Sequence, residues 1–244
     1  MMTTDRTGPA PGAPDRSLQK LSSLVRQALQ KYDMISEGSR IAVGVSGGKD
    51  SLGLLCALAS LKEYYPLKFE IAALTVDLGY DGFDTETIRR FCESKGVEYH
   101  VIKTEISRMI TVGGCSLCAH LRRGALVDFA VQNGFDCIAL GHTMDDMTET
   151  MMLSLIYEGR FSTFLPVTDY ADKGIKIIRP YMLVTNAVST GAARKMNIPV
   201  VANPCPMDRS TERSFVRGLM KDIEKHSPGA RKRMMTAILN GNIF

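Results

Sequence analysis

The sequence SGGKDS at positions 46–51 has the composition of a loop that binds phosphate. It follows the apolar run RIAVGV and leads directly into an apolar stretch at helical spacing. Two adjacent glycines allow a tight turn that brings backbone N–H groups close to an anion, and the start of a helix adds partial positive charge. Serine hydroxyls at both ends of the loop add further donors. We therefore assign all six residues to nucleotide binding: Ser46, Gly47, Gly48, Lys49, Asp50 and Ser51.

The acid in this loop narrows the choice of ligand. A carboxylate repels bare phosphate unless a Mg²⁺ ion intervenes, so Asp50 favours a nucleotide–metal complex and is a candidate catalytic residue. The spacing matches neither the GxxxxGK[ST] loop of Walker A proteins nor the GxGxxG fingerprint of dinucleotide-binding proteins. The alternative is a sharp strand-to-helix turn that binds no ligand.

Three of the six cysteines lie in segments where they are available for chemistry. Cys115 and Cys118 form a CxxC pair at the start of a predicted helix, where thiolates are stabilised, and Cys205 stands between two prolines. Three cysteines without an evident fourth ligand suit an iron–sulfur cluster with one open iron. The alternatives are zinc bound with His120 or His226, a redox pair without metal, and inert cysteines.

A second set of polar residues closes other predicted strands, and we assign it to the same nucleotide site: Asp77, Gly141, Asp145 and Asp146. The two adjacent acids lie at the expected N-terminus of a helix, where carboxylates are favoured. One of them, Asp145, is a candidate for holding Mg²⁺ or orienting the attacking group, and simple helix capping is the alternative. Arg122 lies one helical turn beyond Cys118, so we expect it to point toward both the cluster and the phosphates.

Strands alternate with helices along the chain, which predicts βαβ units and a doubly wound, Rossmann-like parallel sheet of the α/β class. In such sheets ligands bind at the carboxyl ends of the strands, where the phosphate loop, Asp77 and the GHTMDD segment all begin. We divide the chain into a flexible tail at 1–16, a nucleotide-binding body at 17–176 and a basic helical part of the same domain at 177–244. The predicted strands are 40–45, 69–76, 97–102, 135–141 and 175–180, and the predicted helices include 18–32, 51–61, 85–96, 115–134, 145–159, 211–226 and 229–240.

Composition and charge add limits on location and partner. The chain has 244 residues, 45% of them apolar, which is enough for one large domain with a sizeable core. No apolar run approaches the roughly 20 residues needed to cross a bilayer, and the first residues lack a signal-peptide core, so we expect a cytoplasmic location without membrane contact. From Arg179 onward eleven Lys and Arg face four Asp and Glu. This basic end predicts a polyanionic partner, and a solvated helix face is the alternative.

The phosphate loop resembles the SGGxDS pyrophosphate loop of the N-type ATP pyrophosphatases, which use ATP to adenylate a carbonyl or amide-like oxygen. Four longer segments resemble, in the same order, those of the tRNA 2-thiocytidine synthetase family: KYDMISEGSRIAVGVSGGKDSL, CSLCAHLRRGAL, LGHTMDDMTETMMLSLIYEGR and IIRPYML. The resemblance runs from about residue 18 to residue 240. It implies a five-stranded parallel sheet with helices on both sides, an adenine nucleotide alpha-hydrolase-like fold.

The resemblance also implies an activity, the thiolation of cytidine 32 in tRNA with ATP, Mg²⁺ and a 4Fe-4S cluster. The implied cluster ligands are Cys115, Cys118 and Cys205. In the expected mechanism the pyrimidine oxygen attacks the α-phosphate of ATP, and sulfide held on the open iron then displaces AMP. Inorganic sulfide or a cysteine desulfurase persulfide would supply the sulfur. The apolar helix MMLSLIYEGR has enough surface to contribute to a homodimer.

One departure from the family pattern concerns the cysteines near the C-terminus. Family members often carry a second CxxC there, whereas the segment NPCPMD provides Cys205 alone. Three cluster ligands remain, but no fourth cysteine stands there to pass sulfur as a persulfide. The alternative functions are the same chemistry on another tRNA base or a small metabolite, and a non-catalytic iron–sulfur sensor that binds nucleic acid.

Overall fold

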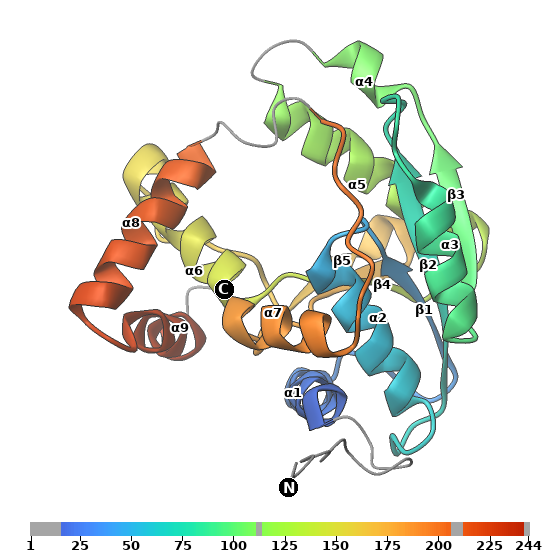
Figure 1. Ribbon diagram of the computed structural model, residues 1–244, viewed down its shortest axis with the longest axis horizontal. Coiled ribbons are helices and arrows are strands. Elements are labelled where there is room, and N and C mark those ends of the chain that lie inside the picture. The colour runs from blue at the N-terminus through green and yellow to red at the C-terminus, as the bar shows by residue number, and fades with distance from the viewer. Residues whose placement is uncertain (1–15, 111–113, 206–211, 242–244) are drawn as a thin grey trace, which may run out of the picture.

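One sheet with the strand order β3-β2-β1-β4-β6-β5 organises the molecule (Figure 1). The computed structural model describes residues 16–110, 114–205 and 212–241. Within these residues all neighbouring strands are parallel except β5 and β6, which are antiparallel. The strands are β1 (Ser39–Gly44), β2 (Phe69–Asp77), β3 (Glu98–Lys103), β4 (Cys137–Leu140), β5 (Val167–Tyr170) and β6 (Ile175–Ile178).

Helices cover both faces of this sheet. On one face α1 (Arg16–Lys31), α2 (Lys49–Leu61), α3 (Thr85–Ser94) and α7 (Asn186–Lys195) bury their apolar sides in the larger core cluster. On the other face α5 (Cys115–Gln132) packs against the second cluster, which includes residues of β1, β2, β4 and β6. Successive strand residues point to opposite faces, so the central strands feed both clusters and read as continuous apolar runs.

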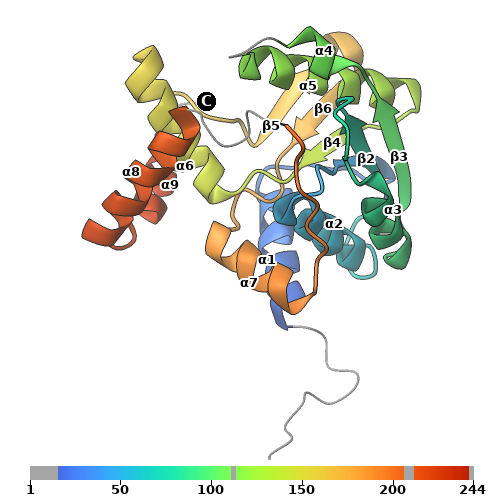
Figure 2. The ribbon, with the colours of Figure 1, turned by 45° about the horizontal axis from the view of Figure 1, so that its top comes forward.

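A group of helices lies to one side of the sheet, as Figure 2 shows. It consists of α6 (Met144–Leu153) with its π-helical continuation η1 (Ser154–Glu158), α8 (Glu212–His226) and α9 (Ala230–Asn240), which contact one another. Two short elements complete the described chain, α4 (Ile106–Met109) and the 3-10 turn η2 (Ala171–Lys173). None of the described helices is long and apolar enough to cross a membrane.

The predicted α/β class and doubly wound parallel sheet are confirmed, with one strand more than the five expected. The additional strand, β5, lies at the sheet edge and pairs with β6 through the turn at η2. Its residues are half-buried or exposed, so its sequence lacks the apolar run by which the buried strands were predicted. The boundary expected at residue 177 falls inside β6, so the basic C-terminal part begins within the sheet.

Candidate nucleotide and cysteine site

The phosphate loop leaves the sheet at its topological switch point, because β1 pairs with β2 on one side and with β4 on the other. Gly47 has φ +80°, a left-handed conformation that glycine adopts without strain. A Cβ atom at this position would lie 3.0 Å from the Cβ of Val201. The amide of Val201 in turn donates to the carbonyl of Gly47 at 3.0 Å, so the segment after α7 lies directly on the loop.

The two serines of the loop bond mainly to the loop itself. Ser51 Oγ donates to the carbonyl of Gly48 at 3.0 Å, and the amide of Ser46 donates to Ser51 Oγ at 3.1 Å. Gly48 is the N-cap residue of α2 and contributes no capping side chain. The first N–H groups of the helix are therefore available to an anion, in a loop whose shape the serine hydroxyls maintain.

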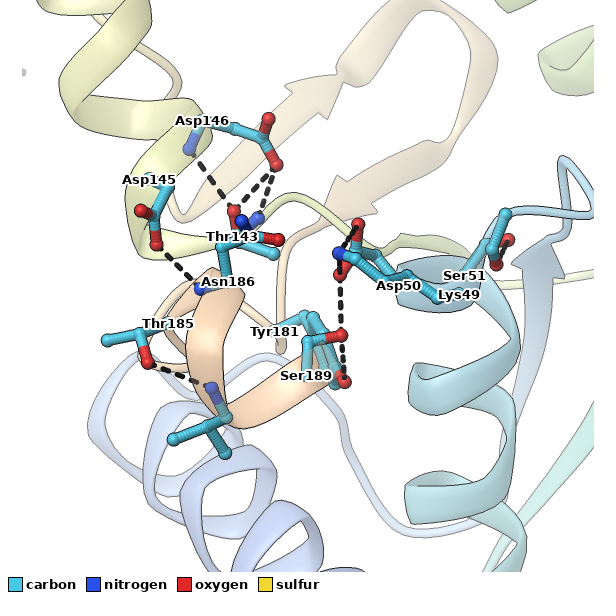
Figure 3. Close-up of polar contacts among 12 residues, drawn as sticks. Lys49, Asp50, Ser51, Thr143, Asp145, Asp146, Tyr181, Thr185, Asn186 and Ser189 are labelled. Atoms are coloured by element: carbon cyan, nitrogen blue, oxygen red, sulfur yellow. Dashed lines mark hydrogen bonds and ion pairs between the residues drawn. The ribbon is translucent and has the colours of Figure 1, made fainter. Parts of the chain in front are cut away.

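Asp50 is held by side chains from two parts of the chain, as Figure 3 shows. Lys49 Nζ lies 2.7 Å from Oδ1 and 2.8 Å from Oδ2 of this carboxylate. On the other side Ser189 Oγ donates to Asp50 Oδ1, and the hydroxyl of Tyr181 lies 3.1 Å from Ser189 Oγ. Burial raises the pKa of Tyr181, so its phenol stays protonated and donates. Gly53 of α2 leaves room for this phenol, because a Cβ there would lie 2.5 Å from the Tyr181 oxygen.

Gly141 brings the turn after β4 against the phosphate loop. A Cβ atom at this position would lie 3.0 Å from the backbone carbon and oxygen of Asp50 and 3.0 Å from the Cα of Ser51. Backbone atoms within a helix cannot move away as a flexible side chain can. The glycine that we assigned to nucleotide binding therefore has a packing role at the same edge of the sheet.

The two acids after β4 both bond to helix N-termini. Asp146 forms a capping box with Thr143, whose Oγ1 and backbone N–H each donate to its carboxylate at 2.8 Å. Asp145 accepts from the amide of Asn186 at 2.6 Å, at the start of α7 (Figure 3). The capping that we considered as the alternative for these acids is therefore present. Both acids lie in the first turn of α6, which follows the carboxyl end of β4.

Arg231 of α9 connects Asp145 to a buried acid. Its Nη1 lies 3.2 Å from Asp145 Oδ1 and 3.3 Å from Glu149 Oε1. The side chain of Glu149 is only 4% exposed, and Arg217 of α8 lies 3.4 Å from its other oxygen. This ion-pair group links α6 to α8 and α9, and sequence reasoning missed it because Glu149 lies in an otherwise ordinary helical stretch.

Asp77 shapes the turn that follows β2. Its Oδ1 accepts from the amide of Gly79 at 3.0 Å, and its carbonyl accepts from Thr104. Tyr80 follows in the same turn, next to Cys205 and within electrostatic range of Cys118 and Cys115. Cys205 Sγ lies 4.0 Å from the Tyr80 hydroxyl. The pKa of Tyr80 is raised, first by partial burial and then by nearby thiols, which come from Cys205, Cys118 and Cys115.

The group around Tyr80 offers three thiols, which are the ligand type that iron–sulfur clusters use. In the described residues no three His, Cys, Asp or Glu side chains approach closely enough to hold one metal ion. Cys115 is exposed and the other two thiols are half-buried, so all three are accessible.

Arg122 is exposed on α5, and its charge acts on Cys118. Burial raises the pKa of Cys118, and the positive charge of Arg122 opposes this change. The same guanidinium also lowers the pKa of His142. Arg122 therefore lies within electrostatic reach of both a candidate cluster ligand and the turn that follows β4.

A stack of rings adjoins this turn and was not expected from the sequence. The imidazole of His142 stacks on Phe164 with ring centroids 4.4 Å apart, and the guanidinium carbon of Arg179 lies 5.2 Å from the Phe164 centroid. Burial, assisted by the charge of Arg179, lowers the pKa of His142 to about 4. Its Nδ1 is buried without a hydrogen-bond partner in the described part of the chain. His142 is therefore neutral at pH 7.

The fold and the loop together define a nucleotide-binding α/β protein with a pyrophosphate loop at the switch point of its sheet. Residues 18–223 match the model of the PP-loop domain family. Relatives named tRNA-cytidine(32) 2-sulfurtransferase are 34% identical in Citrifermentans bemidjiense, over 93% of this chain and 92% of the relative, and 34% identical in Dechloromonas aromatica, over 93% and 83%. The chain belongs to the PP-loop family and, within it, to the family of these sulfurtransferase enzymes.

A solved structure extends the similarity to three dimensions. The U34-tRNA thiolase NcsA from Methanococcus maripaludis, with its [4Fe-4S] cluster, superposes with a TM-score of 0.76 at 26% identity. The match covers 91% of this chain and 77% of that protein. The fold of the present chain is therefore that of a tRNA thiolase as well as of a PP-loop protein.

Proposed function

We propose that this protein uses ATP to replace the C2 oxygen of cytidine 32 in tRNA by sulfur. The observation that carries the proposal is the proximity of two groups at the carboxyl edge of the sheet. The phosphate loop bonds through Gly47 to Val201, and Cys205 follows only four residues later, beside Tyr80. Four extended residues span at most about 14 Å, so a nucleotide on the loop and a cluster on the cysteines would be neighbours.

The loop residues would bind and orient the pyrophosphate part of ATP. Backbone N–H groups at the start of α2 would donate to phosphate oxygens, and Lys49 would add positive charge. Mg²⁺ bound with Asp50 would join the phosphates to this carboxylate. Arg122, whose charge acts to lower the pKa of both Cys118 and His142, would stabilise charge that develops on the α-phosphate as the pyrimidine oxygen attacks it. Pyrophosphate would leave, and the base would be activated as an adenylate.

The three thiols would hold a 4Fe-4S cluster, which would supply an open iron site for a sulfide. When that sulfide replaces the activated oxygen, AMP would leave with the oxygen. Inorganic sulfide would provide this sulfur directly, whereas a cysteine desulfurase persulfide would provide it together with a thiol reductant that supplies two electrons. A cytoplasmic location is part of the proposal, and so is a homodimer through the exposed Leu155 and Ile156 of η1. Uridine 34 is the second candidate target, because the superposed NcsA is named for that base.

Anaerobic purification tests this proposal, with iron and sulfide analysis followed by mass spectrometry of tRNA nucleosides after reaction with ATP. We expect about four irons per chain and 2-thiocytidine in the product. Cys205→Ala should lose both the cluster and the product. Cys92→Ala is the matched control, because Cys92 is fully buried in the core. Iron-free anaerobic protein, or thiolation that survives Cys205→Ala, would contradict the cluster assignment.

A further inference from the structure

A cavity of about 530 Å³ opens beside the cysteine group. It is bounded by the start of α5, the end of α6 with η1, residues 162–164 and the start of α8. Its volume lies in the range of small-ligand sites in proteins, roughly 300–1,000 Å³. Lining residues from these four segments include Ser116, Thr150, Tyr157, Glu158, Ser162 and Arg213.

The cavity is lined by residues that are close in the sequence to both parts of the proposed site, the cysteines and the acids of α6. Ser116 follows Cys115 directly, so one wall begins at the cysteine group. Thr150 lies five residues beyond Asp145 on α6, which corresponds to about 8 Å of helix rise. A group bound in the cavity would therefore lie near both the cysteines and the acidic end of α6.

Tyr157 offers an aromatic surface at this cavity. Thr150, Leu153, Ser154 and Tyr157 line it with spacings of three and four residues, so they share one face of α6 and η1. Tyr157 is 52% exposed. Two more aromatic residues are exposed, Phe161 (43%), which follows η1, and Phe215 (60%), which lies on α8. Exposed aromatic rings are the surfaces on which RNA-binding proteins stack unpaired bases.

Glu158 gives the cavity a means to distinguish bases. Its Oε2 accepts from Ser154 Oγ at 3.1 Å and from Arg160 at 2.8 Å, which fixes the orientation of the carboxylate. These hydrogen bonds lower the pKa of Glu158, so it remains an acceptor at neutral pH. A carboxylate accepts from the exocyclic amino group of cytosine, whereas uracil has a carbonyl oxygen at that position.

The charge next to the cavity indicates RNA rather than protein. Basic residues recur at every fourth position along α8, which places them along one side of the helix: Arg213, Arg217, Lys221 and Lys225. Arg213 lines the cavity and donates to Thr150, whereas the exposed Arg217 also pairs with Glu149. Lys221 and Lys225 are exposed. A polyanion that follows this row of charges would reach the cavity with its bases.

We propose that this cavity receives one unstacked cytosine of the RNA substrate, with Tyr157 as the stacking surface and Glu158 as the acceptor for its amino group. The proposal rests on the proposed function, because it takes the substrate to be tRNA. It adds a binding site for the base and a residue that selects cytosine over uracil.

The test uses the cluster-loaded protein and an anticodon stem-loop RNA with the fluorescent base pyrrolocytosine at position 32. Binding to the wild type should quench the fluorescence of this base. Tyr157→Ala should abolish the quench and weaken binding at least fivefold, the effect of losing one stacked base. Tyr64→Ala is the matched control. Tyr64 is similarly exposed, at 55%, but it lies just after α2 and does not line the cavity. An unchanged quench with Tyr157→Ala would overturn the proposal.

A second variant tests base selection separately. The wild type should bind a stem-loop with cytosine at position 32 about tenfold more tightly than one with uracil. Glu158→Gln should reduce this preference to within about threefold, while thermal unfolding shows that the protein is intact. Preference for cytosine that persists in the variant would overturn the role of Glu158.

Failure of this proposal can be told apart from failure of the proposed function. If the wild type thiolates tRNA and Tyr157→Ala does so at the same rate with the same quench, only the cavity assignment fails. If the wild type makes no thiolated tRNA but the Tyr157-dependent quench is present, the cavity assignment stands without the activity. If Tyr157→Ala instead dissociates a dimer and leaves RNA binding intact, the cavity belongs to a protein interface and the proposal is wrong.

Discussion

At the scale of single residues, Asp50 is the acid whose surroundings are most fully defined. Lys49 contacts both of its oxygens, and Ser189 approaches from α7 with support from Tyr181. The hydroxyl of Ser189 donates to this carboxylate and accepts from Tyr181. Ser189 is therefore a positioning residue, which fixes the rotamer of Asp50 through one hydrogen bond.

Ser189→Ala should impair the use of the ATP–Mg²⁺ complex. The loss of one hydrogen bond to a charged group costs about 1.5–3 kcal/mol, or roughly 10- to 150-fold in kcat/KM for ATP in pyrophosphate release. Ser189→Thr should restore most of this activity, because it restores the hydroxyl. Ser60→Ala is the control on α2, since its hydroxyl bonds only to exposed Tyr64. Equal kcat/KM in Ser189→Ala and Ser60→Ala would exclude the positioning role.

Gly141→Ala should destabilise the protein because the new methyl group would meet helix backbone at 3.0 Å. Overpacking of this kind costs about 1–3 kcal/mol, and the shift should also disturb the adjacent phosphate loop. Gly124→Ala is the matched control, since nothing lies within 4 Å of its added Cβ and alanine favours the helix. Thermal unfolding should show a lower Tm for the first variant only. A Tm for Gly141→Ala at or above that of the wild type would contradict this packing role.

At the scale of elements, α7 stands between the two candidate acids. Its N-terminal amide at Asn186 binds Asp145, and Ser189, one turn later, binds Asp50 (Figure 3). One rigid helix thereby sets the separation of a carboxylate after β1 from a carboxylate after β4. The sequence of α7 carries no motif of its own, which explains why its residues were not among the predicted site residues.

The ion pairs of Arg231 attach α9 to α6, and their removal should loosen this attachment. Arg231→Met would leave the nearly buried Glu149 without one of its two partners and Asp145 without its guanidinium. Removing one partner of a buried pair costs about 3–5 kcal/mol, and we expect about 3 kcal/mol because Arg217 remains. Urea unfolding measures the change, with Lys232→Met as an exposed control of equal charge. Similar midpoints for both variants would show that the ion pairs contribute little.

The helices and strands were predictable from the sequence to a greater extent than the side-chain contacts of the site. Apolar runs and helical spacing were sufficient for β1–β4, β6 and the long helices, because burial imposes those patterns on the sequence. The edge strand β5 and the short helix α4 lack such patterns. The capping by Asp146 and the hydrogen bond from Ser189 to Asp50 depend on residues brought together by the fold. The assignment of the cysteines to a cluster remains a prediction.

At the scale of the whole molecule, one row of basic residues lies on a helix outside the sheet. The row of basic residues on α8 belongs to the helical group beside the sheet, whereas the phosphate loop lies at the sheet itself. A long RNA can contact both, with its backbone on α8 and one base near the cysteines. A small metabolite would not need the helical group, so the distribution of charge favours an RNA substrate.

This arrangement predicts how RNA binding depends on salt. Each phosphate contact releases counterions, so Lys221→Ala combined with Lys225→Ala should reduce the slope of log affinity against log salt concentration by about 2. The double variant should bind more weakly at low salt and approach the wild type at high salt. Lys20→Ala with Lys68→Ala removes the same charge from exposed positions on α1 and just before β2. Fluorescence anisotropy with a labelled anticodon stem-loop measures both slopes. If the control pair changes the slope as much as the α8 pair, the attraction comes from net charge alone and α8 is not the contact surface.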